Sequence, residues 1–343
     1  MAEFRGIERL TRPATPFNLP GVRIEAYQRI FGHARIFVFL VIILATNGSQ
    51  AAEYFLFTSF RGNGEDGLHL AWSTNGYQWQ ALNGDQSFLK PQVGAYKIMR
   101  DPCLAEGPDG TFHLVWTSSW TADKGKIIGY ARSKDLVTWS DQQAIPLMEN
   151  EPNTRNIWAP EIFYDQAKAR WLVFWCSTIP GKFPETDSTG DDGYNHRFYC
   201  VTTADFKTFT ESRLLYDPGF NAIDATLFQA GDKFYLFFKD ERKTPQKKNL
   251  RYAMADHPDG PFGKPSEPFT GDWVEGPSAI KLKDEYLVYF DHYAQPHYYG
   301  ALRSKDLEHW EDCSKEMSLP KGHRHGTVLR IPYKIAQRLL AIQ

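Results

Sequence analysis

From Glu53 onward, short apolar runs alternate with turn-forming residues, and no long stretch keeps the period of an amphipathic helix. One arrangement recurs, in which an acidic residue opens a short run and a strongly apolar run follows about ten residues later. The acids that open these repeats are Asp101, Glu161, Asp224 and Glu275, and the apolar runs behind them cover residues 112–116, 171–175, 234–238 and 286–290. Such regular spacing indicates an internal repeat built on strands.

Each repeat predicts four short strands, and in the unit that starts at Ile223 the fourth is expected from Phe262 onward. An N-terminal unit that starts at Tyr54 supplies only three strands, whereas residues 326–331 form one spare strand near the end. Four-stranded units repeated about every 50–60 residues are typical of a β-propeller. We therefore predict an all-β fold, a five-bladed β-propeller. Its ring is closed by the C-terminal strand joining the N-terminal blade.

The domain boundaries follow from this count. The propeller should occupy residues 53–333, with a first blade strand at 98–105, and residues 334–343 should form a C-terminal tail. Residues 1–52 differ in character, because basic residues precede an apolar run at 36–45 and the small residues of Ser49-Gln50-Ala51 follow it. This order is that of a signal peptide with a long basic leader. We expect a secreted or periplasmic protein, with an uncleaved membrane anchor as the alternative.

Composition excludes several classes of function. The net charge is −2, so no basic excess suggests nucleic acid. The four cysteines lack the paired spacing of a zinc site. Cys176 and Cys200 are expected on neighbouring strands, where buried free thiols are favoured over a bridge, which stays open. Aromatic residues make up 15% of the chain, mostly as strand residues and partly as candidate surfaces on which sugar rings stack.

The topology of a propeller brings the acids together. The first strand of each blade lines the central axis and starts on one face, so the four acids and His325, on the closing strand, should surround one funnel. Carboxylates in one funnel repel one another, which raises some of their pKa values. Two carboxylates with separated pKa values are what hydrolysis of a glycosidic bond requires. The alternative is a cation or water cluster filling the axis, with Glu161 and His325 as structural residues.

Second strands return to the same face, so the loops that follow them should form the funnel wall. The loop at 178–196 is unusually long, and loops of that length are usually functional or disordered. The candidate substrate-binding residues are Trp120, Trp158, Glu161, Tyr293, Arg324 and His325.

Three motifs resemble those of glycoside hydrolase family 43, five-bladed propeller enzymes acting on arabinose- and xylose-containing glycans. They are Arg100-Asp101-Pro102, Ala222-Ile223-Asp224-Ala225 and Val274-Glu275-Gly276-Pro277. The resemblance implies that Asp101 is the general base, that Asp224 modulates pKa and orientation, and that Glu275 is the general acid. His325-Gly326-Thr327 is similar to the segment carrying the family's axial histidine, which in some members lies beside a calcium ion or water. The family requires no cofactor, and no catalytic metal is expected.

The resemblance implies an inverting glycosidase that cleaves polysaccharide side chains, most simply an exo-acting α-L-arabinofuranosidase or β-xylosidase-like enzyme. Its partner is an oligo- or polysaccharide, and no stable protein partner is implied. The alternatives are an endo-arabinanase, another furanosidase such as a β-galactofuranosidase, and a catalytically silent sugar-binding propeller. For catalysis Glu275 must be protonated, and we expect the neighbouring Asp101 and Asp224 to raise its pKa.

Overall fold

The computed structural model describes residues 53–121 and 126–342. The predicted signal peptide at 1–52 lies outside these residues. None of the helices in the described part of the chain is long and apolar enough to cross a membrane.

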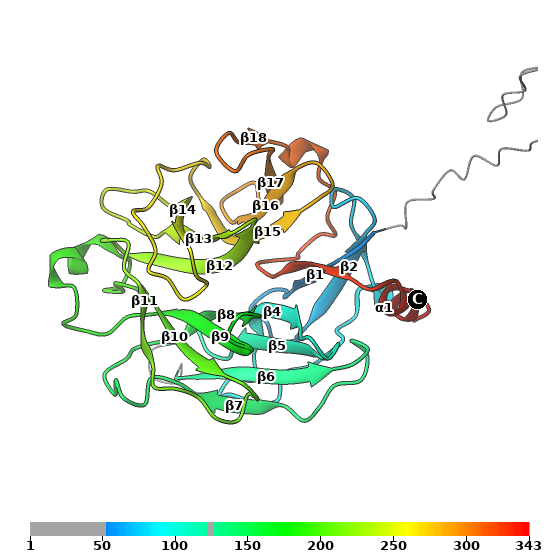
Figure 1. The fold of residues 1–343 in the computed structure, drawn as a ribbon, viewed down its shortest axis with the longest axis horizontal. Coiled ribbons are helices and arrows are strands. Elements are labelled where there is room, and N and C mark those ends of the chain that lie inside the picture. Colours follow the sequence, from blue (N-terminus) through cyan, green and yellow to red (C-terminus); the bar gives the residue numbers. More distant parts are fainter. Residues whose placement is uncertain (1–52, 122–125, 343) are drawn as a thin grey trace, which may run out of the picture. The chain divides into compact units, whose positions relative to one another are not determined.

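The described residues form five antiparallel sheets arranged as the blades of a propeller (Figure 1), which confirms the predicted fold class. Named from the first strand of each blade to the last, blade 1 contains β19 (Val328–Ile331), β1 (Tyr54–Ser59), β2 (His69–Ser73) and β3 (Gln80–Ala81). Blade 2 contains β4 (Arg100–Glu106), β5 (Phe112–Thr117), β6 (Ile127–Ser133) and β7 (Gln143–Pro146). Blade 3 contains β8 (Trp158–Asp165), β9 (Arg170–Ser177), β10 (Arg197–Thr203) and β11 (Arg213–Tyr216).

The last two blades follow the same order. Blade 4 contains β12 (Ala222–Ala230), β13 (Lys233–Asp240) and β14 (Asn249–Ala255). Blade 5 contains β15 (Val274–Lys281), β16 (Tyr286–His292), β17 (Tyr298–Ser304) and β18 (Glu311–Asp312). Helical segments are short: η1 (Asn83–Asp85), η2 (Pro184–Thr189), η3 (Ser314–Glu316) and α1 (Tyr333–Leu340).

The ring closes as predicted. Strand β19 pairs antiparallel with β1, with Tyr54 opposite Ile331 and Phe57 opposite Val328. The two ends of the propeller domain therefore share one blade, which removes an open sheet edge.

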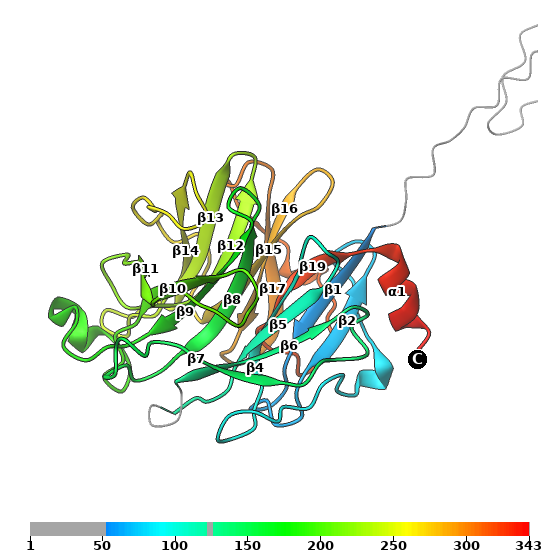
Figure 2. The ribbon, with the colours of Figure 1, turned by 60° about the horizontal axis from the view of Figure 1, so that its bottom comes forward.

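Two segments differ from the prediction. Helix α1 (Figure 2) stands where a tail was expected. Ala336 and Leu339 recur at helical spacing and are buried in the apolar cluster that contains Leu56. Blade 4 has three strands, because the segment after Phe262 follows β14 through hydrogen bonds such as Phe269 N to Leu250 O without forming a strand. Its prolines at 265 and 268 cannot donate to a ladder.

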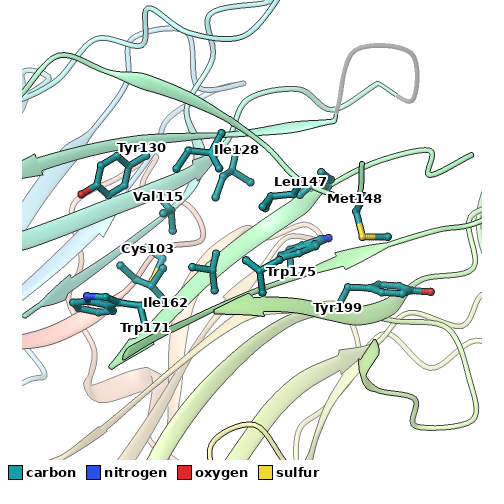
Figure 3. Packing of buried hydrophobic residues seen from close by; sticks show 14 of the residues in the cluster. Cys103, Val115, Ile128, Tyr130, Leu147, Met148, Ile162, Trp171, Trp175 and Tyr199 are labelled. Atoms are coloured by element: carbon teal, nitrogen blue, oxygen red, sulfur yellow. The ribbon is translucent and has the colours of Figure 1, made fainter. Parts of the chain in front are cut away.

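The core lies between neighbouring blades. Figure 3 shows one such layer, where Val115 and Ile128 of blade 2 meet Ile162 and Trp175 of blade 3. These side chains alternate along their strands, so the opposite face of each strand meets the other neighbouring blade. All four cysteines are buried and free, so Cys176 and Cys200 form no bridge.

Candidate active site

A β-bulge near the start of each of four inner strands aims side chains at the axis. Pairing with the second strand shifts register at this point in β4, β8, β12 and β15. One residue of each bulge has left-handed backbone, with φ between 45° and 59°: Asp101, Ala159, Asp224 and Gly276. A bulge bends its strand and re-aims the side chains around it. Because the bulge recurs at the same point, it defines equivalent positions in the four blades.

These positions line a cavity of about 420 Å³. The residues preceding the left-handed ones line it in all four blades, and they are Arg100, Trp158, Ile223 and Glu275. The other lining residues are Asn63, Asp101, Thr117, Trp120, Asp224 and His325. Asp101, Asp224 and Glu275 therefore face one cavity, as predicted.

Glu161 has a different environment. It lies two residues beyond the left-handed Ala159, so it falls outside the two positions that face the cavity. Its side chain is buried, and the Thr226 hydroxyl donates to Oε2 at 3.0 Å. Burial raises the pKa of Glu161 to about 7. The regular spacing of the four acids suggested that they occupy equivalent positions. Measured from the bulge, they do not, because Glu161 lies two residues beyond the left-handed residue.

Asp101 is held as a carboxylate. The Thr117 hydroxyl donates to its Oδ2 at 2.8 Å, and His325 Nδ1 lies 3.3 Å from its Oδ1. Burial acts to raise the pKa of Asp101, but the positive charge of His325, its hydrogen bond and the charge of Arg100 together lower it to about 2. An ionised, anchored carboxylate can accept a proton from water.

His325 supplies positive charge at the centre of this cluster. Its Nδ1 faces Asp101 and lies 3.8 Å from Asp224 Oδ2. Burial acts to lower the pKa of His325, but Asp224 and Asp101 raise it to about 9. The ring packs against Gly276, where an added Cβ would lie 2.4 Å from His325 Cγ, so only glycine fits there.

Calcium beside the axial histidine was one expectation from the motif resemblance. Within residues 53–121 and 126–342, no group of three or more His, Cys, Asp or Glu side chains could hold a metal ion. The protonated ring of His325 instead balances Asp101 and Asp224. A calcium ion or water beside His325 stays an expectation from the motif resemblance, and no catalytic step is routed through it.

Asp224 and Glu275 are held differently. The Gly276 N–H donates to Asp224 Oδ2 at 3.3 Å. Burial, together with the negative charges of Glu275 and Asp101, raises the pKa of Asp224 to about 7, against the opposing charge of His325. Glu275 instead receives a cation on each oxygen, with Lys239 Nζ 3.1 Å from Oε2 and Arg324 Nη2 3.2 Å from Oε1.

The two cations reverse the expected shift at Glu275. Burial acts to raise the pKa of Glu275, but the charges of Lys239, Arg324 and His325 outweigh it and lower the pKa. The expectation that neighbouring acids raise this pKa is wrong. Lys239 and Arg324 supply the charges that decide this pKa, and Arg324 was expected to bind substrate instead.

Lys239 and Asp291 were missed. Each lies near the end of a second strand, and Lys239 pairs opposite Ile223 whereas Asp291 pairs opposite Glu275. Lys239 is almost fully buried and also contacts Glu241 Oε2 at 2.7 Å. Asp291 is fully buried and lies 3.5 Å from Arg324 Nε. A charged residue directly after an apolar run was the signal that could have identified both.

The aromatic candidates take different places. Trp120 and Trp158 line the cavity, and Trp158 Nε1 donates to Ser119 O at 3.0 Å. Tyr194 of the long loop packs on Trp158 with ring centroids 4.7 Å apart, so this loop supports the wall. Tyr293 does not line the cavity, and its ring lies 4.4 Å from Lys239 Nζ.

Comparison with known proteins agrees with this geometry. Residues 50–335 match a family described as a probable glycosyl hydrolase domain related to glycoside hydrolase family 43. The chain is 30% identical over 140 residues to an α-L-arabinofuranosidase of Bifidobacterium longum subsp. longum, a match covering 38% of this chain and 13% of that relative's length. An α-L-arabinanase of Cellvibrio cellulosa, solved with arabinohexaose, has a similar fold: TM-score 0.55, 14% identity, 81% of this chain and 96% of that chain covered.

Proposed function

The chain belongs to the family of probable glycosyl hydrolases related to glycoside hydrolase family 43, and on this premise we propose that it removes terminal pentose units from a glycan. An α-L-arabinofuranoside is the first choice of substrate, because a relative of that name matches over 140 residues. A β-xyloside is the second choice, from the motif resemblance. The cavity of about 420 Å³ supports an exo-acting enzyme, since it lies toward the lower end of the sizes of small-ligand pockets, about 300–1,000 Å³.

The proposed mechanism is a single displacement with inversion. Asp101 accepts a proton from water while the water oxygen attacks the anomeric carbon, and Glu275 donates a proton to the oxygen of the breaking bond. The observation that carries this proposal is that both side chains line one cavity but have different partners, with His325 beside Asp101 and cations beside Glu275.

The proton for this reaction needs a source. Because the pKa of Glu275 is lowered and that of Asp224 is raised, a proton bound by this pair is favoured on Asp224 before substrate binds. A bound sugar excludes water, which disfavours the charged form of a carboxylate and so favours protonated Glu275. We propose that Asp224 holds the proton until substrate arrives.

The test uses the full-length protein with 4-nitrophenyl glycosides of arabinofuranose, xylose and galactofuranose, and with Glu275→Gln as the control. We expect hydrolysis of the arabinofuranoside, and proton NMR should show the inverted anomer first. Release of short oligosaccharides from linear arabinan, rather than single sugars, would favour an endo-acting enzyme. Binding without hydrolysis of any substrate would favour a silent sugar-binding propeller.

A further inference from the structure

A second cavity, of about 1000 Å³, lies beside blade 5. Its walls come from the start of β17 and from the segment 312–323, which joins β18 to β19 and so crosses from blade 5 to blade 1. The segment ends at His323, which directly precedes Arg324 and His325 of the candidate active site. No role has been assigned to this cavity above.

A chain of contacts connects the second cavity with Glu275. Arg324 Nη2 lies 3.2 Å from Glu275 Oε1, and its Nε lies 3.5 Å from Asp291 Oδ2. The other oxygen of Asp291 lies 2.6 Å from Nε2 of His297, which lines the second cavity. Three successive polar contacts therefore lead from the proposed general acid to the wall of the second cavity.

The lining suits a carbohydrate. Tyr298 is 40% exposed, and its ring stacks on His292 with centroids 4.4 Å apart and planes inclined by 14°. A supported, exposed aromatic face can pack against the apolar face of a sugar ring while its rim stays polar. Ser318, Lys315 and Lys321 add hydroxyl and ammonium groups around it that can bond to sugar hydroxyls.

We propose that this second cavity binds the part of the glycan on the leaving-group side of the scissile bond. The inference rests on the proposed function, because a general acid must face the oxygen of the leaving group. The remainder of the glycan therefore departs past Glu275 and Arg324, toward the cavity that begins at His297. Tyr298 is the residue on which a distal sugar ring stacks.

The kinetic test compares Tyr298→Ala with Tyr333→Ala, which removes another exposed tyrosine, on helix α1. Each full-length variant is assayed on a 4-nitrophenyl glycoside, whose leaving group carries no further sugar, and on an oligosaccharide of the same sugar. We expect Tyr298→Ala to raise KM for the oligosaccharide about tenfold, the size expected for one aromatic contact. The kinetics of Tyr298→Ala on the aryl glycoside should match those of the wild type, which also shows that the variant folds. Tyr333→Ala should match the wild type on both substrates.

A binding measurement separates this inference from the proposed function. In the Glu275→Gln background, calorimetry with the same oligosaccharide should show about tenfold weaker binding when Tyr298 is also replaced by alanine. A wild-type enzyme that cleaves the aryl glycoside, with Tyr298→Ala unchanged on both substrates and in binding, overturns the second site alone. A wild-type protein that cleaves none of the glycosides overturns the proposed function, and the leaving-group site with it.

Discussion

Asp224 and Glu275 stand at the starts of the inner strands of adjacent blades and line the same cavity, yet their pKa values shift in opposite directions. Burial acts to raise both. At Asp224 burial and the negative charges of Glu275 and Asp101 outweigh the charge of His325, and its pKa rises to about 7. Glu275 lies between Lys239 and Arg324, and its pKa falls. The repeat therefore fixes where a carboxylate stands, while residues outside the repeat decide which protonation state it prefers.

The source of this difference lies across a blade boundary. Lys239 belongs to β13 of blade 4, whereas the carboxylate that it holds belongs to β15 of blade 5. Arg324 comes from the segment before β19, far away in sequence. Two blades with the same sequence pattern can thus present acids whose pKa values shift in opposite directions. Substitutions at Asp224, Glu275 and Lys239 test this difference.

The largest expected effect concerns which acid donates the proton. Glu275→Gln should lower kcat by about 10²–10⁴-fold on an alkyl glycoside, because a poor leaving group requires proton donation. On a 2,4-dinitrophenyl glycoside the loss should nearly vanish, since this leaving group departs without a proton. Asp224→Asn, which lacks the proton held for Glu275, should also slow the alkyl glycoside more than the 2,4-dinitrophenyl glycoside, but by less than Glu275→Gln does. The measurement is kcat for each variant across a series of leaving groups.

One outcome would reverse the assignment of Glu275 as the proton donor. If a good leaving group rescues Asp224→Asn and not Glu275→Gln, then the raised pKa of Asp224 marks it as the proton donor. Asp101→Asn serves as the control, because loss of the general base should not depend on the leaving group.

A second prediction concerns pH. Protonated Glu275 is the active form, so activity falls as pH rises through its pKa. Lys239→Met removes a positive charge that favours the ionised form, so the pKa should rise and the alkaline limb of kcat/KM should move to higher pH. Asp224→Asn removes the group that holds the proton of this coupled pair, so the same limb, which then reports Glu275 alone, should move to lower pH. Shifts of opposite sign in Lys239→Met and Asp224→Asn would confirm that the two residues act on the alkaline limb in opposite directions.

Lys248→Met is the matched control for Lys239→Met. Lys248 is also buried and lies 2.7 Å from Glu241, but its other ion pair is with Asp191 rather than with Glu275. The alkaline limb of kcat/KM for Lys248→Met should stay close to that of the wild type. Equal shifts in both lysine variants would mean that general loss of charge, and not contact with Glu275, sets the pH profile.

The third prediction concerns Gly276, the left-handed bulge residue that follows Glu275 and donates its N–H to Asp224. Gly276→Ala places a Cβ against His325 at a φ of +59° and should lower the free energy of unfolding by about 2–4 kcal/mol, from backbone strain and overpacking together. Gly219→Ala has a φ of +83° with open space around it, so about 1 kcal/mol is expected. Urea denaturation measures both, and equal losses would show that the close approach of His325 costs nothing.

The pattern of apolar runs predicted the fold because each blade is a local unit of antiparallel strands. It also predicted that Asp101, Asp224 and Glu275 share one cavity, because topology alone brings the starts of inner strands together. The missing fourth strand of blade 4 could have been read from the prolines at 265 and 268. Helix α1 was missed because one short amphipathic segment carries little weight beside five strand repeats.

The charge state of the site could not be predicted in the same way. It depends on contacts between blades, such as Lys239 with Glu275, which no spacing within one repeat reveals. The place of Glu161 depends on a bulge, and a bulge shifts a side chain by one position without leaving a distinct residue type in the sequence. The shared location of Asp101, Asp224 and Glu275 was readable from the repeat, whereas the location of Glu161 and the protonation states required the structure.

The smallest expected effect is on stability. The pKa of Asp224 is about 7 in the folded protein, against a reference value of 3.8. The folded state therefore holds this proton more tightly than the unfolded chain, and stability falls as pH rises from about 4 to 7. Asparagine cannot ionise, so Asp224→Asn should lose this decline and exceed the wild type at pH 7 by about 1–2 kcal/mol, a size usual when a strained site is relieved.

Urea denaturation between pH 4 and 7 is the measurement, because the contribution of His325, whose pKa is about 9, stays largely constant below pH 6.5. Asp232→Asn, an exposed change in the turn between β12 and β13, should follow the wild-type curve. Parallel curves for wild type and Asp224→Asn would mean that Asp224 stays ionised throughout this range. The opposition between Asp224 and Glu275 would then be lost, and Glu275 would need another source for the proton that it donates.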